Sequence, residues 1–215
     1  MFPFGPSKNE QRCNEHYQKA RILYGEGRID DAIFALGVAI GANPQPEIYQ
    51  LLGHLYSGKG EFGKAATAFF DGRMLVEREL GLLPARIPET VIVFLHDEAL
   101  AYLRADDWEF ARIRSHLALT DIEFGRAPRY SSYGDSESWL RLIRMIATLQ
   151  ENLDFHSAQA DARWLHEKSV VEGYSEIYTP VLSSMPTDTR VAKVVLEQWK
   201  RYDSGRRTLP ICWAS

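Results

Sequence analysis

Hydrophobic and small residues along the first third of the chain follow one pattern twice. Residues 20–32 and 53–65 align at a constant offset of 33 residues, the separation of Ala32 and Ala65. Apolar residues three and four positions apart indicate helices on either side of a central glycine. The two copies therefore predict two helical hairpins. The paired positions run small, large, glycine, large, small: Ala20 with Gly53, Leu23 with Tyr56, Gly27 with Gly60, Ile29 with Phe62, and Ala32 with Ala65.

Each position in this pattern has a physical role in a hairpin of helices. Small residues allow two helix axes to approach closely, and bulky residues fill the space around the contact. A glycine ends the first helix because it adopts the left-handed conformation without a steric penalty. The pattern continues into the second helix of each hairpin, where Leu36 pairs with Phe69 and Ala39 with Gly72.

Two later segments follow the pattern less closely. A third hairpin is indicated by Ala99, Tyr102, Trp108, Ala111 and Ala118, with Ser115 at a position that favours a larger residue. A fourth matches at Leu149, Phe155 and Ala158 but departs from the pattern at Ile146, Ala162 and Leu165. The spacing lengthens to 46 residues from Ala65 to Ala111 and 47 from Ala111 to Ala158. Longer helices or loops are expected there.

The repeated unit resembles the tetratricopeptide repeat, a helix–turn–helix of about 34 residues. The resemblance is carried by Tyr49, Leu52, Gly53, Tyr56, Ala65 and Phe69. It is clearest over residues 13–78, weaker to residue 125 and weakest to residue 172. It implies an all-α fold: a right-handed α-α superhelix of three to four helical hairpins with a C-terminal capping helix.

Helix boundaries follow from capping signals. Helices are expected over residues 8–25, 29–42, from 46, 62–80, 89–104, 108–124, from 136, 155–171, and from a Thr187 cap to 202. Ser7 and Glu10 predict a capping box, and the pairs Asp30–Asp31 and Asp106–Asp107 are expected to cap the helices after them. The predicted segments are an extension (1–12), three hairpins (13–125), a loop (126–134), a fourth hairpin (135–172), a capping region (173–203) and a tail (204–215).

Composition narrows the class of protein. The net charge of −4 disfavours nucleic-acid binding, and the two cysteines, Cys13 and Cys212, are too few for a disulfide scaffold. No segment resembles a signal peptide or a membrane span. We therefore expect a cytoplasmic protein with reduced thiols and no membrane insertion.

No catalytic motif stands out. The cluster His96-Asp97-Glu98 is interpreted as a solvated helix face, because neighbours in sequence point to different sides of a helix. Neither cysteine has the spacing of a zinc site. The sequence predicts no enzyme, no cofactor and no metal. An unfamiliar active site in the loop from Arg126 to Tyr133 stays open as the third hypothesis.

A protein or peptide partner is the expected ligand. In tetratricopeptide proteins the first helix of each unit lines the concave face, and the resemblance carries that role to Asn14, Tyr17, Arg21, Tyr24, Gln50, His54, His96, Arg104 and Arg144. Tyr17, Arg21, Tyr24 and His54 are the preferred residues, since tyrosine and arginine dominate binding hot spots. The carboxylate clamp of heat-shock co-chaperones is absent. The predicted function is a non-catalytic adaptor, chaperone or assembly factor; the alternative is a structural subunit of a larger or self-associating assembly.

Overall fold

The computed structural model describes residues 6–81, 85–131, 134–151, 155–168 and 189–206. The described chain is helical, apart from one short antiparallel ribbon. Its elements are α1 (Lys8–Gly25), α2 (Ile29–Ala42), α3 (Pro46–Gly58), α4 (Phe62–Leu80), α5 (Glu89–Arg104), α6 (Trp108–Glu123), β1 (Tyr130–Ser131), β2 (Gly134–Asp135), α7 (Ser136–Gln150), α8 (Phe155–Lys168) and α10 (Thr189–Arg206).

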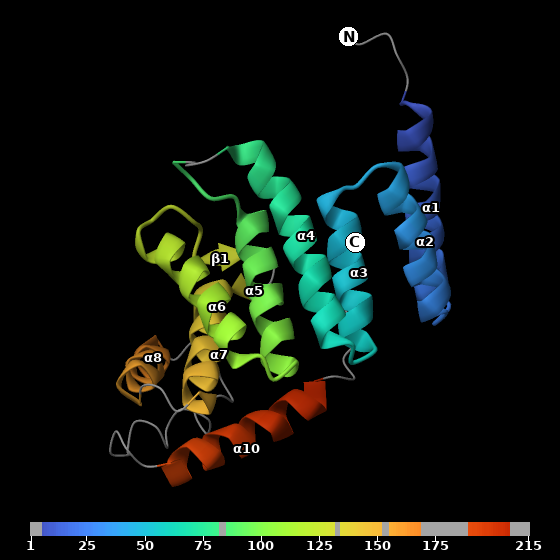
Figure 1. Ribbon diagram of the computed structural model, residues 1–215. Helices are drawn as coiled ribbons and strands as arrows, with labels where there is room; N and C mark the ends of the chain where they lie inside the picture. Colours follow the sequence, from blue (N-terminus) through green and yellow to red (C-terminus); the bar gives the residue numbers. More distant parts are fainter. Residues whose placement is uncertain (1–5, 82–84, 132–133, 152–154, 169–188, 207–215) are drawn as a thin grey trace.

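Consecutive helices pack as antiparallel hairpins. The pairs α1–α2, α3–α4, α5–α6 and α7–α8 are each in contact, and α4 packs on α5 as α6 does on α7. Figure 1 shows these helices side by side, from α1 and α2 at one end to α8 at the other. The expected all-α fold is confirmed at this level, and most of the expected helix boundaries agree with the structure.

The small residues of the repeat lie at close contacts between helices. Ala20, Ala32 and Ala65 are fully buried. At Gly53 an added Cβ would lie 2.4 Å from the ring of Phe69, and at Gly72 it would lie 2.7 Å from the ring of Phe94. Helices that approach so closely have no room for a side chain at these positions, which is the role that the sequence pattern predicts.

The turn of the third hairpin uses a residue that the pattern did not identify. Gly27 and Gly60 have φ of 76°, and Asp106 occupies the corresponding position with φ of 60°. Asp106 is therefore not a cap, whereas Asp107 does cap α6 by accepting from the Phe110 amide at 3.5 Å. The expected caps Asp30 and Asp31 are also wrong: they lie in the first turn of α2, whose N-cap Arg28 makes no side-chain cap.

The second half of the chain is more deeply packed than the first. α5 is buried on all sides from Val91 to Ala99, and α7 is buried along almost its whole length. α10 packs against α7, and its Val195 and Trp199 belong to the same apolar cluster as residues of α5, α7 and α8. Its axis runs crosswise to the hairpin helices (Figure 1).

Two expectations change in this region. The segment 126–134, expected as a loop, contains β1 and the first residue of β2, and Tyr130 pairs with Asp135. The last helix begins at Thr189 and ends at Arg206, beyond the expected residue 202. Among the described residues it packs against α7, the first helix of the last hairpin, and its Val195 and Trp199 share an apolar cluster with residues of α8. The proposed Thr187 cap, Tyr133 and the tail from residue 207 lie outside the described residues.

Two further findings bear on the sequence expectations. In the described part of the chain, no helix is both long and apolar enough to cross a bilayer. Cys13 is a free, buried thiol whose Sγ lies 3.2 Å from the Asn43 carbonyl oxygen, while Cys212 is not in the described ranges.

Candidate functional site

Three of the predicted partner-binding residues meet at one hollow. Tyr17, Arg21 and Tyr24 are four and three residues apart, so they fall on one stripe of α1. With Leu51 of α3 they line a hollow of about 300 Å³. The stripe exists because Cys13, Ala20 and Leu23 on another side of α1 are buried against α2 and α3.

The polar groups of this hollow are available. Among the described residues, Arg21 has no carboxylate within ion-pair distance, and the hydroxyls of Tyr17 and Tyr24 make no hydrogen bond. Burial raises the pKa of the Tyr17 phenol, which Arg21 partly offsets and Glu47 reinforces. The Tyr17 hydroxyl is therefore protonated at neutral pH and able to donate a hydrogen bond.

Beside this hollow, α3 is linked to α5 through two histidines and one carboxylate. His54 Nε2 lies 3.6 Å from Asp97 Oδ2, and His96 Nδ1 lies 3.1 Å from Asp97 Oδ1. The ring of His54 packs edge-on against Phe69, and that of His96 against Trp139. Burial lowers the pKa of His54; Asp97 opposes this shift and His96 adds to it.

The solvated-face interpretation of His96-Asp97-Glu98 is wrong. His96 is 8% exposed and Glu98 is fully buried. Glu98 lies between two arginines from neighbouring helices, with Arg73 Nε at 2.5 Å and Arg114 Nε at 2.9 Å. Glu98 on α5 can be buried because arginines on α4 and α6 offset the cost of removing its charge from water. The sequence of α5 alone does not indicate that these partners are present.

The remaining predicted residues do not join the hollow. Asn14 is exposed on α1 and Gln50 is partly buried on α3. The Arg104 guanidinium lies 5.9 Å from the ring centroid of Phe62. Arg144 pairs with Asp161 of α8 at 2.7 Å. His96 and Arg144 thus make contacts within the chain, and their role in partner binding stays a prediction.

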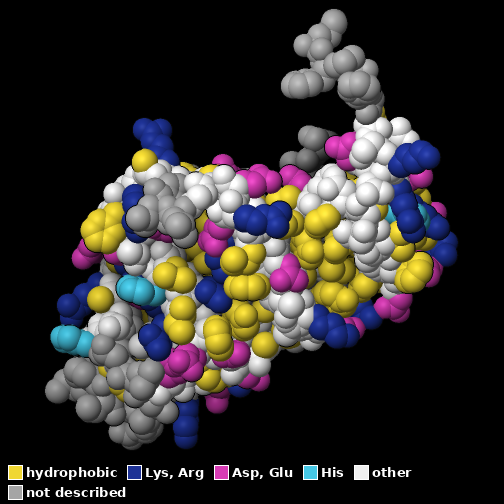
Figure 2. All heavy atoms as spheres, turned by 45° about the horizontal axis from the view of Figure 1, so that its top comes forward, with side chains coloured by type: hydrophobic (Ala, Val, Ile, Leu, Met, Phe, Trp, Pro, Cys, Tyr) yellow, Lys and Arg dark blue, Asp and Glu magenta, His cyan; other side chains and the backbone are white. Residues whose placement is uncertain are grey.

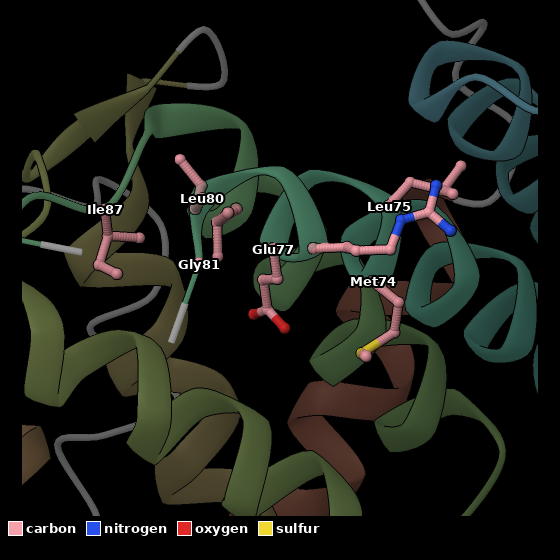
Figure 3. Close-up of a pocket in the computed structure, with 8 residues that line it drawn as sticks. Met74, Leu75, Glu77, Leu80, Gly81 and Ile87 are labelled. Atoms are coloured by element: carbon pink, nitrogen blue, oxygen red, sulfur yellow. The ribbon is translucent and has the colours of Figure 1, made fainter. Parts of the chain in front are cut away.

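A second, larger hollow was not predicted from the sequence. It has a volume of about 750 Å³ and lies between the C-terminal half of α4 and the start of α5. Met74 and Glu77 project from α4 toward it, and Ile87 lies near its far end (Figure 3). Its lining is largely apolar: Met74, Leu75, Leu80, Ile87 and Val91, with Glu77, Arg78 and Gly81. It depends on how α4 and the start of α5 lie relative to each other, and the hydrophobic periodicity within either helix does not indicate this.

Neither hollow contains a group of side chains that could hold a metal ion, among the residues that the structure describes. No group of three or more histidine, cysteine, aspartate or glutamate side chains among the described residues is arranged to hold a metal ion. Comparison of the chain with protein families, with curated proteins and with solved structures finds no match. Both hollows could bind a ligand. The α1–α3 hollow offers aromatic and cationic groups, and the hollow between α4 and α5 offers apolar walls.

Proposed function

We propose that this protein is a non-catalytic protein–protein interaction module that holds a segment of a partner against α1 and α3. One observation carries the proposal: Tyr17, Arg21 and Tyr24 share a hollow with Leu51, and their polar groups make no hydrogen bond or ion pair among the described residues. Tyrosine and arginine around an apolar floor form the composition of binding hot spots.

The arrangement of helices supports a tetratricopeptide-like interpretation of this module. The hairpins follow one another, and the first helices of the first two hairpins supply the residues of the hollow. In such a superhelix these helices line the concave face. The buried α5 and α7 leave α1 and α3 as the helices that offer this face to a partner.

The test is an affinity purification from the native cell with three forms of the full chain. These are wild type, the double variant Tyr17→Ala with Arg21→Ala, and the control Arg12→Ala with Lys19→Ala. Arg12 and Lys19 are exposed on the opposite side of α1. A partner retained by wild type and control and lost by a folded site variant supports the proposal. Retention by all three forms rejects the α1–α3 hollow as the binding site.

A second candidate is a subunit of a larger assembly that uses another face. The larger hollow beside α4 favours it, as do Phe34 on α2, which is 75% exposed, and Met74, which is 44% exposed. Hydrophobic side chains gather on the face in Figure 2 over the part where α2 and α3 lie. Loss of the partner from Met74→Glu, with retention by the Tyr17/Arg21 variant, would favour this candidate.

A further inference from the structure

Arg21 is exposed to solvent, whereas the arginines that face neighbouring helices are buried or half-buried. Arg73, Arg114 and Arg144 each pair with a carboxylate of another helix. Arg21 has no such partner among the described residues, although it lies in the middle of the α1 stripe and lines the hollow. A guanidinium offers donors in a planar fork that matches a carboxylate. The hollow therefore has an anion-binding group that no carboxylate of the described residues occupies.

The groups around Arg21 define the charge that the hollow accepts. Tyr17 and Tyr24 lie on either side of it along α1 and are uncharged hydroxyl donors. Arg21 is the sole cation among the described residues that line the hollow, and the Glu47 carboxylate is close enough to act on Tyr17. One guanidinium matches the charge of one carboxylate, whereas a dianion would lack a second cation and would be repelled more strongly by Glu47.

We propose that the hollow binds the carboxylate of a single aspartate or glutamate side chain in the partner segment. Arg21 pairs with this carboxylate, a tyrosine hydroxyl donates to it, and Leu51 contacts the apolar part of the same segment. The inference rests on the proposed function and adds the chemistry of the anchor. A phosphate group fits less well, because a phosphoryl dianion is held best by a cluster of cations and Glu47 repels a dianion more strongly than it repels a single carboxylate.

A peptide-display selection on the full-length chain tests this chemistry directly. Random peptides are selected on wild type, on Arg21→Glu and on the control Arg12→Glu, whose charge lies on the opposite side of α1. Wild type and control are expected to enrich peptides with Asp or Glu at one shared position. Arg21→Glu is expected to replace that preference with Lys or Arg at the same position, because the charge that selects it is reversed.

Titration with resynthesised peptides measures how much the acidic residue contributes to the binding affinity. Replacing the selected acidic residue by Ala is expected to weaken binding to wild type about tenfold or more, and to change binding to Arg21→Ala by much less. Replacing it by phosphoserine is expected to give no gain in affinity. Tighter binding of the phosphoserine peptide would overturn the choice of a carboxylate.

The outcomes of these experiments distinguish failure of the carboxylate anchor from failure of the proposed binding function. Enriched peptides without a shared acidic position, lost on Tyr17→Ala with Arg21→Ala, overturn the carboxylate anchor and leave the binding module intact. Acidic peptides that bind Arg21→Glu as well as wild type also overturn the anchor. If no peptide is enriched on the wild-type chain, the anchor is rejected and the proposed function loses its support as well.

Discussion

Buried charge in the middle of the molecule shows how single residues shape the packing. Glu98 contacts Arg73 from α4 and Arg114 from α6, so one carboxylate joins three helices. The Arg114 guanidinium also lies 5.7 Å from the ring centroid of Phe70 and 5.9 Å from that of Phe110. Such a group is costly to bury alone and stable only while its partners remain.

Glu98→Ala is accordingly expected to lower the free energy of unfolding by about 3–5 kcal/mol, because two arginines would stay buried without their shared carboxylate. Urea unfolding followed by circular dichroism measures the loss. Glu109→Ala, an exposed acid on α6, is the matched control and should stay within about 0.5 kcal/mol of wild type. A loss below 1 kcal/mol for Glu98→Ala, roughly the scale of an exposed ion pair, would contradict this role.

The lowered pKa of His54 predicts how the stability of the fold changes with pH. Its pKa is lowered from 6.5, first by burial, so the folded chain keeps this ring neutral where the unfolded chain protonates it. The unfolded state therefore binds the extra proton, and this contribution to stability is lost as the pH falls through 6.5. His96 and Asp97 of α5 face the same ring and set its local charge.

Wild type is thus expected to lose stability more steeply than His54→Gln between pH 6.5 and 5, by at most about 1.4 kcal/mol per pH unit for one proton. Unfolding curves recorded across this range give the two slopes. Between pH 7.5 and 8.5, where the ring is neutral in both states, the two curves should run parallel. Equal slopes at acid pH would show that His54 is as easily protonated in the fold as in the unfolded chain.

At the scale of elements, some helical glycines are required by close packing, whereas others lie in open space and only lower the helix propensity. At Gly53 a methyl group would meet the buried ring of Phe69, whereas at Gly37 nothing lies within 4 Å. Gly53→Ala is expected to cost about 1–3 kcal/mol through overpacking. Gly37→Ala, in the exposed middle of α2, is expected to stabilise by about 0.5–1 kcal/mol. Thermal unfolding compares the two variants, and the same sign of change in both would reject this packing of α3 on α4.

The same elements show what the sequence could predict. Gly53 and Phe69 were assigned correctly because the small and large residues recur at a fixed offset and satisfy one packing rule. Asp106 was missed because the third hairpin reaches the left-handed turn without glycine. The choice of Tyr17, Arg21 and Tyr24 came from the register of the repeat that the chain resembles. The burial of His96 could not be predicted in this way, because it depends on which helices pack around α5, and these include distant parts of the chain.

For the whole molecule, α10 distinguishes the second half from the first. Val195 and Trp199 belong to the apolar cluster of α5, α7 and α8, so residues far apart in the chain share one core. The helices α1, α2 and α3 form a separate apolar cluster. In an array where contacts are mainly between neighbours, the two ends can differ in local stability.

Trp199→Ala is therefore expected to destabilise the second half selectively. Removing a side chain that is 6% exposed should cost about 3–5 kcal/mol, since it leaves a cavity against α7. Amide hydrogen exchange read by mass spectrometry should rise strongly in α7 and α8 and much less in α1 and α2. Lys200→Ala, an exposed neighbour on the same helix, controls for a change in the helix propensity of α10 and should leave exchange unchanged.

A uniform rise in exchange along the chain in Trp199→Ala would mean that the array unfolds as one cooperative unit. Loosening confined to α7 and α8 would instead leave the α1–α3 hollow intact, so partner binding should survive loss of the contact that α10 makes with α7.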